Sequence, residues 1–291
     1  MTTGHTRVFF MVADPIEQVR TPEIFNKVLP LCGVDAVMVP LQVAPEHLVD
    51  TVRALFRSNT TAGMVLSIPH KTCAAGLVDK RSKIAATANA VNAIRRNADG
   101  SLEGALFDGL GFVKSLDRYR MPYEGKRVLI IGAGGAGSAI ATSLAAGGPA
   151  QISVYDPDTA KARQVTEAIR EHFAVAAEAT GSNDPAGFDL VINASPLGLK
   201  RDDPLPVPVA ALQPGTQVCD ILMKNQPTPL LQASIEQGLQ VQPGFDMLIL
   251  QTPLFFDFFG LEHVANHLRR DDSAVREMLF PKELHRLVEP A

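Results

Sequence analysis

Lys126-Arg-Val-Leu-Ile-Ile-Gly-Ala-Gly-Gly-Ala-Gly137 is the stretch that decides the fold of this chain. A short apolar run ends in Gly132-x-Gly134-x-x-Gly137, and an Ala-rich stretch follows. A second β-type run, Gln151-Ile-Ser-Val-Tyr-Asp156, then ends in an acid. This order of strand, glycines, helix and acid is typical of a βαβ unit that binds a dinucleotide. A glycine-rich turn that serves packing alone is the alternative, and it does not explain the spacing of the other parts.

Each glycine of the pattern has a mechanical reason. Gly132 permits a tight turn, Gly134 lets the backbone approach a pyrophosphate, and Gly137 lets the helix pack against the strand. The helix N-terminus adds unpaired N–H groups and a partial positive charge for the phosphates. We therefore predict cofactor contacts from Asp156 and from the residues of this loop, which are Gly132, Ala133, Gly134, Gly135, Ala136 and Gly137.

The composition bounds the class of protein. The chain has 291 residues, enough for two domains with sizeable cores. It is 46% hydrophobic and 20% charged with a net charge of −4, which is typical of a soluble globular protein and favours neither nucleic acid nor an anionic membrane surface as a partner. No apolar run reaches the ~18 residues of a membrane span, and the N-terminus lacks the pattern of a secretory signal.

The cysteines give a further indication of the compartment. There are three, Cys32, Cys73 and Cys219, and they are scattered without CxxC spacing. They are expected to be buried or incidental thiols, not disulfide partners or zinc ligands, so we predict no metal site and a cytoplasmic location.

Strand-like and helix-like runs alternate along the chain, which predicts mainly parallel sheets covered by helices. In the first part we expect strands at 7–13, 36–41 and 63–68, helices at 22–31 and 45–58, and a hairpin formed by 91–95 and 102–106. From residue 128 we expect strands at 128–131, 151–155, 189–193, 217–221 and 240–242, and helices at 137–146, 159–172 and 228–237.

The fold class is therefore α/β, with two domains. An N-terminal α/β substrate domain with a mainly parallel sheet is expected over residues 1–107, completed by C-terminal helices over about 246–291. A connecting helix at 108–120 opens a Rossmann-type NAD(P)-binding domain over 108–245. The helical pattern after Gly244 is interrupted by Pro253, and its aromatic run, 255–259, is predicted to be core or domain interface.

Two features outside the glycine loop suggest chemistry. Ser67-Ile-Pro-His-Lys71 presents a lysine just after a strand, and Phe107-Asp108-Gly109 places an acid where the first domain meets the connecting helix. Ligands of open α/β sheets bind at such strand ends. A lysine beside an aspartate can exchange a proton with a substrate hydroxyl while the aspartate holds it. Taken singly, Lys71 is better explained as a surface lysine and Asp108 as a helix N-cap; it is the combination that predicts a site.

Further segments occur in the order of a known family. They are Pro15–Pro22, Val65–Lys71, Asn89–Ala93, Leu106–Gly109, Ile192–Gly198, Asp220 with Thr228–Leu230, and Gly244–Gln251. With the glycine loop they resemble the motifs of the shikimate/quinate dehydrogenase family along almost the whole chain.

The resemblance implies an activity and a site. Lys71 and Asp108 would be the catalytic pair, Thr21, Ser67, Asn92 and Gln251 would bind the substrate, and Asn193, Ser195 and Asp220 would belong to the cofactor site. The implied reaction is reversible hydride transfer between a nicotinamide cofactor and the ring 3-hydroxyl of shikimate or a related hydroxylated cyclic carboxylic acid, as in aromatic amino acid biosynthesis. The partners would be the small-molecule substrate and, in a homodimer, a second copy; a monomer is equally compatible.

Two alternatives stay open at this point. Lys71 would act as a base or as a relay, and a base at neutral pH needs its pKa lowered by roughly three units from ~10.4. The second open alternative concerns the function of the chain: instead of an enzyme, it would be a catalytically weak paralogue that senses a metabolite or dinucleotide as a regulator. The retained pair of Lys71 and Asp108 favours an enzyme. The order of the motifs disfavours a dehydrogenase of folates or amino acids.

The chain also departs from the family where a substrate carboxylate is held. The family has two serines in the first loop and a tyrosine beyond the Asp220 position, and here Val19, Thr21 and Met223 stand there. Val65 replaces an asparagine. Each lost hydrogen bond to a charged group is worth about 1.5–3 kcal/mol. The departures predict a poor shikimate dehydrogenase or an enzyme for a related, less polar ring acid. Arg20 is a candidate compensating charge, or else a solvated loop arginine.

Cofactor preference is indicated by the residues after the second Rossmann strand. The family's NADP-dependent members carry an Asn-Arg-Thr segment there, whereas this chain has Asp156-Pro157-Asp158. A carboxylate at this place can accept hydrogen bonds from ribose hydroxyls and repels a phosphate. Lys161 and Arg163 lie nearby but are expected to face solvent. We therefore favour NAD as the cofactor, with NADP possible.

Overall fold

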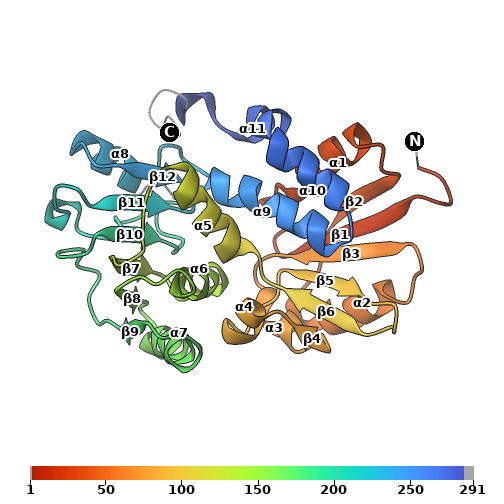
Figure 1. The fold of residues 1–291 in the computed structure, drawn as a ribbon, viewed down its shortest axis with the longest axis horizontal. Helices are drawn as coiled ribbons and strands as arrows, with labels where there is room; N and C mark the ends of the chain where they lie inside the picture. The colour runs from red at the N-terminus through yellow and green to blue at the C-terminus, as the bar shows by residue number, and fades with distance from the viewer. Residues whose placement is uncertain (1, 201, 285–291) are drawn as a thin grey trace. The chain divides into compact units, whose positions relative to one another are not determined.

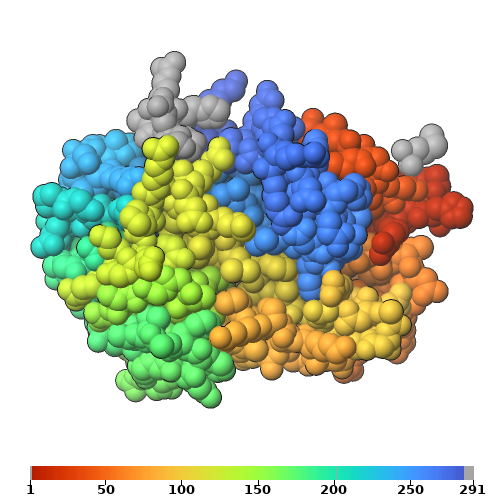
Figure 2. Space-filling model, viewed as in Figure 1, coloured from red at the N-terminus to blue at the C-terminus, as the bar shows by residue number. Residues whose placement is uncertain are grey.

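The computed structural model describes residues 2–200 and 202–284, which form two compact α/β units. Unit 1 comprises the described residues up to Phe107 together with Gln251–Met278, and unit 2 comprises Asp108–Leu250 and the described residues from Leu279 (Figure 1). The C-terminal segment of unit 1, blue in Figure 2, lies directly beside its red N-terminal elements. Residues from both parts of the sequence therefore build unit 1.

Unit 1 contains a mixed six-stranded sheet of order β2-β1-β3-β5-β6-β4. Its strands are β1 (Arg7–Ala13), β2 (Ala36–Gln42), β3 (Thr61–Leu66), β4 (Lys80–Arg81), β5 (Ala93–Arg96) and β6 (Leu102–Ala105). The β1 strand pairs in parallel with β2 and β3, whereas β5 runs antiparallel to both β3 and β6. The chain therefore leaves β1 and β3 at the same edge, where their following loops meet.

The helices of unit 1 largely follow the predicted pattern. They are α1 (Thr21–Leu31), the 3-10 turn η1 (Pro45–His47), α2 (Leu48–Leu55), α3 (Lys71–Ala75), α4 (Lys83–Thr87), the second half of α9 (Phe245–Phe258), α10 (Glu262–Arg270) and α11 (Ser273–Leu279), whose last residue belongs to unit 2. The helix predicted over 45–58 is shorter: the Thr61 hydroxyl donates to the Leu55 carbonyl at 2.7 Å, which ends α2 and leads into β3.

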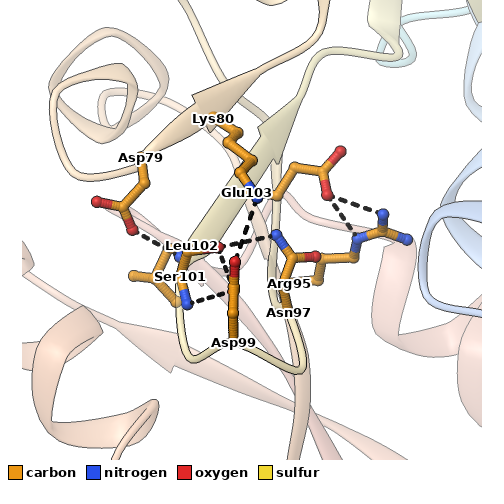
Figure 3. A network of polar contacts seen from close by, with 8 residues as sticks. All are labelled: Asp79, Lys80, Arg95, Asn97, Asp99, Ser101, Leu102 and Glu103. Carbon is orange, nitrogen blue, oxygen red and sulfur yellow. Dashed lines mark hydrogen bonds and ion pairs between the residues drawn. The ribbon is translucent and has the colours of Figure 1, made fainter.

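The predicted hairpin forms, and polar contacts fix its turn (Figure 3). Asp99 accepts from both the backbone N–H and the hydroxyl of Ser101, at 3.0 and 2.6 Å, and pairs with Lys80 at 3.3 Å. These hydrogen bonds lower the pKa of Asp99 to about 2. Gly100 adopts a φ of +86°, a conformation that glycine permits at a turn.

Unit 2 contains a fully parallel six-stranded sheet of order β12-β11-β10-β7-β8-β9. Its strands are β7 (Arg127–Ile131), β8 (Gln151–Tyr155), β9 (Ala176–Ala179), β10 (Leu190–Asn193), β11 (Gln217–Asp220) and β12 (Val241–Pro243). This is the Rossmann strand order, and it reverses between β7 and β10, where such folds bind dinucleotides. The predicted dinucleotide-binding fold is confirmed.

The remaining helices of unit 2 are α5 (Asp108–Arg118), α6 (Gly135–Ala145), α7 (Thr159–His172), α8 (Pro229–Glu236), the first half of α9, and the 3-10 turns η2 (Val209–Ala211) and η3 (Lys282–Leu284). The α6 helix packs on α5, α7, β7 and β8, and this surrounding explains why its sequence is almost entirely small and apolar.

The aromatic run of α9 lies in the core of unit 1, as predicted. Phe25 stacks on Phe256 with ring centroids 4.4 Å apart, and Phe9 contacts Phe259 at 5.0 Å. A Cβ at Gly63 would overlap the Phe259 ring, so β3 needs glycine at this position.

Among the described residues, no helix is long and apolar enough to cross a membrane. The last part of the C-terminal helices predicted over about 246–291, residues 285–291, lies outside the described residues.

Candidate active site

The backbone around Asn92 brings three segments of unit 1 together. The Leu66 N–H at the end of β3 donates to the Asn92 carbonyl, and the Asn92 N–H donates to Ala105 at the end of β6, both at 2.9 Å. The neighbouring Val91 N–H donates to the carbonyl of Lys71, the first residue of α3, at 2.8 Å. Asn92 therefore lies where β3, β6 and the Lys71 helix converge.

The side chain of Asn92 extends this arrangement. Its Oδ1 accepts the backbone N–H of Phe107 at 3.0 Å, and its Nδ2 donates to Oε1 of Gln251 at 3.4 Å. Asn92 is 1% exposed and Gln251 is 4% exposed. Two residues predicted from the resemblance thus lie in contact although 159 positions separate them in the chain.

The segment before Lys71 is fixed to the central strands. The Ser67 N–H donates to Val12 of β1 at 2.9 Å, and the Asp14 N–H donates to the Ile68 carbonyl at 3.0 Å. Ile68 itself is 61% exposed. Ser67 and Lys71 are half-buried, so this edge of the sheet presents a hydroxyl and an amine.

His70, within this segment, is buried, and no role was predicted for it. Its Nε2 has no hydrogen-bond partner in the described part of the chain. Burial lowers the pKa of His70, and the Val43 backbone and the charge of Asp14 partly oppose that change. The Asp14 backbone is held at the strand end that precedes Lys71 by its hydrogen bond to Ile68.

Arg20 does not stand alone in its loop. Its guanidinium pairs with Glu23, with Nε–Oε1 at 2.6 Å and Nη2–Oε2 at 2.8 Å. Thr21, the first residue of α1, is buried beside this pair. Arg20 is therefore a partly exposed arginine whose charge is already matched by Glu23 within the first turn of α1.

Asp108 begins α5 and is buried. It follows Phe107 directly, so the hydrogen bond from Phe107 to Asn92 also fixes the backbone that leads into Asp108. Lys71 belongs to unit 1 and Asp108 to unit 2, and their pairing stays a prediction. A Cβ at Gly109 would overlap the Ala139 carbonyl, so the glycine after the acid lets α5 approach α6 closely.

The glycine loop of unit 2 fits a dinucleotide phosphate. Gly132 has a φ of +104°, and a Cβ at Gly137 would overlap the Gly132 carbonyl, so both positions need glycine for the fold itself. Gly134 is different, because a Cβ there would meet nothing within 4 Å. Gly134 is also the N-cap of α6 and supplies no side chain to its N–H groups. The loop thus leaves open space at a helix N-terminus, which suits a pyrophosphate.

Asp156 lies at the end of β8, next to this loop. Its Oδ2 accepts the Ala133 N–H and its Oδ1 accepts the Asp158 N–H, both at 2.8 Å. Lys161 is 60% exposed and lies 3.6 Å from Asp158, and Arg163 is exposed. Lys161 thus lies beside a second carboxylate, Asp158, two residues after Asp156.

Asn193 and Asp220 form a buried network at the ends of β10 and β11. Asn193 Nδ2 donates to Asp220 Oδ1 at 3.1 Å, and the Ser195 hydroxyl donates to Asn193 Oδ1 at 2.7 Å. Thr228, which the sequence analysis did not single out for the site, donates to Asp220 Oδ2 at 2.7 Å. Burial raises the pKa of Asp220 to about 6, against these hydrogen bonds, which lower it. The polar groups hold the two loops together, and contact with a cofactor stays a prediction.

The described residues contain no group of three or more His, Cys, Asp or Glu arranged to hold a metal ion. Cys32, Cys73 and Cys219 are free thiols, and Cys219 is buried.

Unit 2 is a Rossmann unit with an open glycine loop. Unit 1, next to it in the chain, has a lysine and amides at its strand ends. These features define a dinucleotide-dependent oxidoreductase. Comparisons with known proteins extend this assignment. Residues 11–94 match the shikimate dehydrogenase substrate binding domain, and residues 128–241 match the saccharopine dehydrogenase NADP binding domain.

Among curated relatives, shikimate dehydrogenase (NADP(+)) of Rubrobacter xylanophilus is 33% identical over 85% of this chain and 88% of its own. Among solved structures, shikimate 5-dehydrogenase from Listeria monocytogenes in complex with shikimate and NAD is 28% identical, with a TM-score of 0.82 over 92% of this chain and 98% of its own. 5-ketofructose reductase of Gluconobacter sp. is 27% identical, with a TM-score of 0.80 over 92% of this chain and 99% of its own. The chain belongs to the shikimate dehydrogenase family, and the regulatory alternative has no support in these relatives.

Proposed function

We propose that the chain catalyses reversible hydride transfer between a nicotinamide cofactor and the ring 3-hydroxyl of shikimate or a related hydroxylated cyclic compound. Unit 1 binds the substrate through Thr21, Ser67, Asn92 and Gln251. The observation that supports this proposal most directly is the convergence at Asn92, whose hydrogen bonds gather the ends of β3 and β6, Lys71 and Phe107. Unit 2 binds the cofactor at its glycine loop.

The residues divide the chemistry between them. The nicotinamide ring supplies the hydride acceptor or donor when bound. Lys71 exchanges the proton of the reacting hydroxyl, and Asp108 holds that hydroxyl by a hydrogen bond. Asn92 fixes the backbone before Asp108 and so maintains the position of the carboxylate. Burial of Asp108 keeps water from competing for its hydrogen bonds.

We further propose that NAD is preferred over NADP, although the curated relative named above is an NADP(+) enzyme. Asp156 and Asp158 place two carboxylates at the end of β8, and Lys161 is already beside one of them. A 2′-phosphate would meet negative charge there, whereas ribose hydroxyls can donate to Asp156.

An uncharged polyhydroxylated ketone is a second candidate substrate. Arg20 is paired with Glu23, and Val19 and Val65 cannot donate a hydrogen bond, so a substrate carboxylate finds few partners in unit 1. The Gluconobacter relative carries the same fold and is named for the reduction of a ketose.

One experiment tests the proposed function. The purified protein is screened for NADH and NADPH formation with shikimate, quinate, their methyl esters and neutral polyols. Turnover that falls by at least a thousandfold in Lys71→Ala, with unchanged NADH binding, supports the proposal; loss of a positioned acid–base group typically costs factors of about 10²–10⁴. The matched control is Lys27→Ala, an exposed lysine on α1 that should keep full activity. Absence of turnover across the panel, or a fully active Lys71→Ala, refutes the proposal.

The cytoplasmic location and the monomeric or homodimeric state stay predictions.

A further inference from the structure

Two loops of unit 2 leave the sheet at the same edge, because they follow the neighbouring parallel strands β10 and β11. We call residues 194–200 the β10 loop and residues 221–228 the β11 loop. The loops are joined where they begin. The Asn193 amide donates to the Asp220 carboxylate at 3.1 Å, and the Ile221 N–H donates to the Asn193 carbonyl, also at 3.1 Å.

Farther along the loops, one side chain joins them a second time. The Nδ2 group of Asn225 in the β11 loop donates to the carbonyls of Gly198 and Leu199 in the β10 loop, at 3.1 and 2.8 Å. An amide nitrogen carries two N–H groups, so both carbonyls can be bound at once. A Cβ at Gly198 would lie 3.2 Å from a methyl group of Leu222, so the two loops also pack on each other here. We call the double hydrogen bond of Asn225 the clasp.

The backbone of Asn225 is unusual for its position. Its φ of +54° lies in the left-handed region, which residues other than glycine, asparagine and aspartate rarely adopt. Asn225 is also exposed, so burial of its side chain does not explain this conformation. Uncommon backbone conformations persist where the surrounding structure holds them, often at functional sites. The two hydrogen bonds of the clasp provide such support.

The clasp lies on one half of the proposed dinucleotide site. In the strand order β12-β11-β10-β7-β8-β9, the glycine loop follows β7 and Asp156 ends β8. The proposed contacts of these groups with the pyrophosphate and a ribose place the adenosine half of the cofactor over β7 and β8. A dinucleotide extends across the point where the strand order reverses, so its nicotinamide half lies at the ends of β10 and β11. These are the strands whose loops the clasp joins.

We propose that Asn225 is a positioning residue for the nicotinamide half of the cofactor: it holds the β10 and β11 loops, before the cofactor binds, in the arrangement that this half requires. The inference rests on the proposed function, since it assumes that unit 2 binds a nicotinamide dinucleotide. Loops that are ordered in advance lose less conformational freedom when a ligand binds, so the affinity is higher.

The test compares NADH with ADP, which has the adenosine and both phosphates but lacks the nicotinamide half. Calorimetry with the full-length protein at neutral pH gives both affinities. Asn225→Asp keeps the size of the side chain and tolerates the left-handed conformation, but a carboxylate cannot donate to the carbonyls. Asn225→Gly removes the clasp without adding a charge and permits the same backbone.

Both variants should bind NADH at least about fivefold more weakly than the wild-type protein, the ratio that corresponds to one net hydrogen bond, and should bind ADP within about twofold of it. The matched control is Arg120→Gly. Arg120 is an exposed residue of unit 2 with a φ of +50°, so its replacement makes the same backbone change and should leave the ratio of the two affinities unaltered. Thermal unfolding shows that each variant is folded.

An unchanged NADH affinity in Asn225→Gly overturns the inference. An equal loss of NADH and ADP affinity also overturns it, because the change would then act on unit 2 as a whole. If the wild-type protein binds neither NADH nor ADP, the proposed cofactor site fails together with the inference. If it binds both and the variants lack the predicted ratio, only the inference fails.

Discussion

The carboxylate of Asp156 accepts the backbone N–H of Ala133 at 2.8 Å, which joins the end of β8 to the glycine loop after β7. The residue proposed to select the cofactor thus also shapes the loop that holds its phosphates. A change at Asp156 is therefore expected to affect both affinity and preference.

Asp156→Ala should weaken NADH binding about tenfold, because one charge-assisted hydrogen bond is worth about 1.5 kcal/mol or more. It should weaken NADPH binding less, since a repulsive charge near the 2′-phosphate is also lost. Fluorescence titration with both reduced cofactors gives the ratio. Asp158→Ala removes the same charge two residues away and should shift the ratio less. A ratio that is unchanged in Asp156→Ala contradicts the assignment of NAD.

The open space at Gly134 leads to a second prediction. Gly134→Ala should leave the melting temperature within about 2 °C of the wild-type value, since the added methyl group meets no protein atom within 4 Å. It should weaken NADH binding at least tenfold, because the methyl group occupies the space expected for the pyrophosphate. Gly137→Ala should instead destabilise the fold, and Gly4→Ala, at another open position, should change neither property. Normal NADH affinity in Gly134→Ala would place the dinucleotide elsewhere.

The ion pair between Arg20 and Glu23 suggests that an available positive charge is withheld from the substrate. Glu23→Gln should free the guanidinium and tighten shikimate binding by up to about fivefold, the range expected for a partly exposed ion pair. Methyl shikimate, which has no charge, should bind as it does to the wild-type protein. The double variant Arg20→Ala/Glu23→Gln should lose the gain. If Arg20→Ala alone weakens shikimate binding strongly, Arg20 reaches the carboxylate despite its partner.

The amino-acid pattern predicted the Rossmann unit well because all its signals are local. The apolar strands, the glycines and the acid at Asp156 lie within about thirty positions, and each has one mechanical reason. The elements that were not predicted are short or weakly patterned. The α3 and α4 helices have five residues each and β4 has two, too few for a period to appear. The β9 strand, Ala-Ala-Glu-Ala, has no apolar alternation to distinguish it.

The residues assigned to the site stay predictions, and the hydrogen bonds that connect some of them could not be predicted from the sequence. Asn92 and Gln251 were named from a resemblance, yet nothing in the sequence indicates that their amides touch across 159 positions, or that the Phe107 N–H orients both. The pairing of Arg20 with Glu23 follows helical spacing and was available from the sequence. The expectation of a loop at Arg20 left this i,i+3 pair out.

The buried carboxyl of Asp220 predicts an unusual pH dependence of stability. Its pKa is raised from 3.8 to about 6 in the folded protein, so between these pH values the folded state binds more protons than the unfolded state. This group therefore destabilises the fold as the pH rises from about 4 to about 6, by up to about 3 kcal/mol, and its contribution is constant above that range.

Asp220→Asn keeps the shape and stays neutral, so its stability relative to the wild-type protein should increase over the same pH range. Its amide oxygen can still accept from Asn193 and Leu222, and its NH₂ group can donate to Thr228. Urea unfolding at pH 4.5 and pH 7 measures the difference. Glu167→Gln, an exposed residue of α7, controls for the loss of one charge and should show little change between the two pH values. A variant that is less stable than the wild-type protein at pH 7 would show that the ionised carboxylate is favoured by its hydrogen bonds with Thr228, Leu222 and Asn193 more than it is disfavoured by burial.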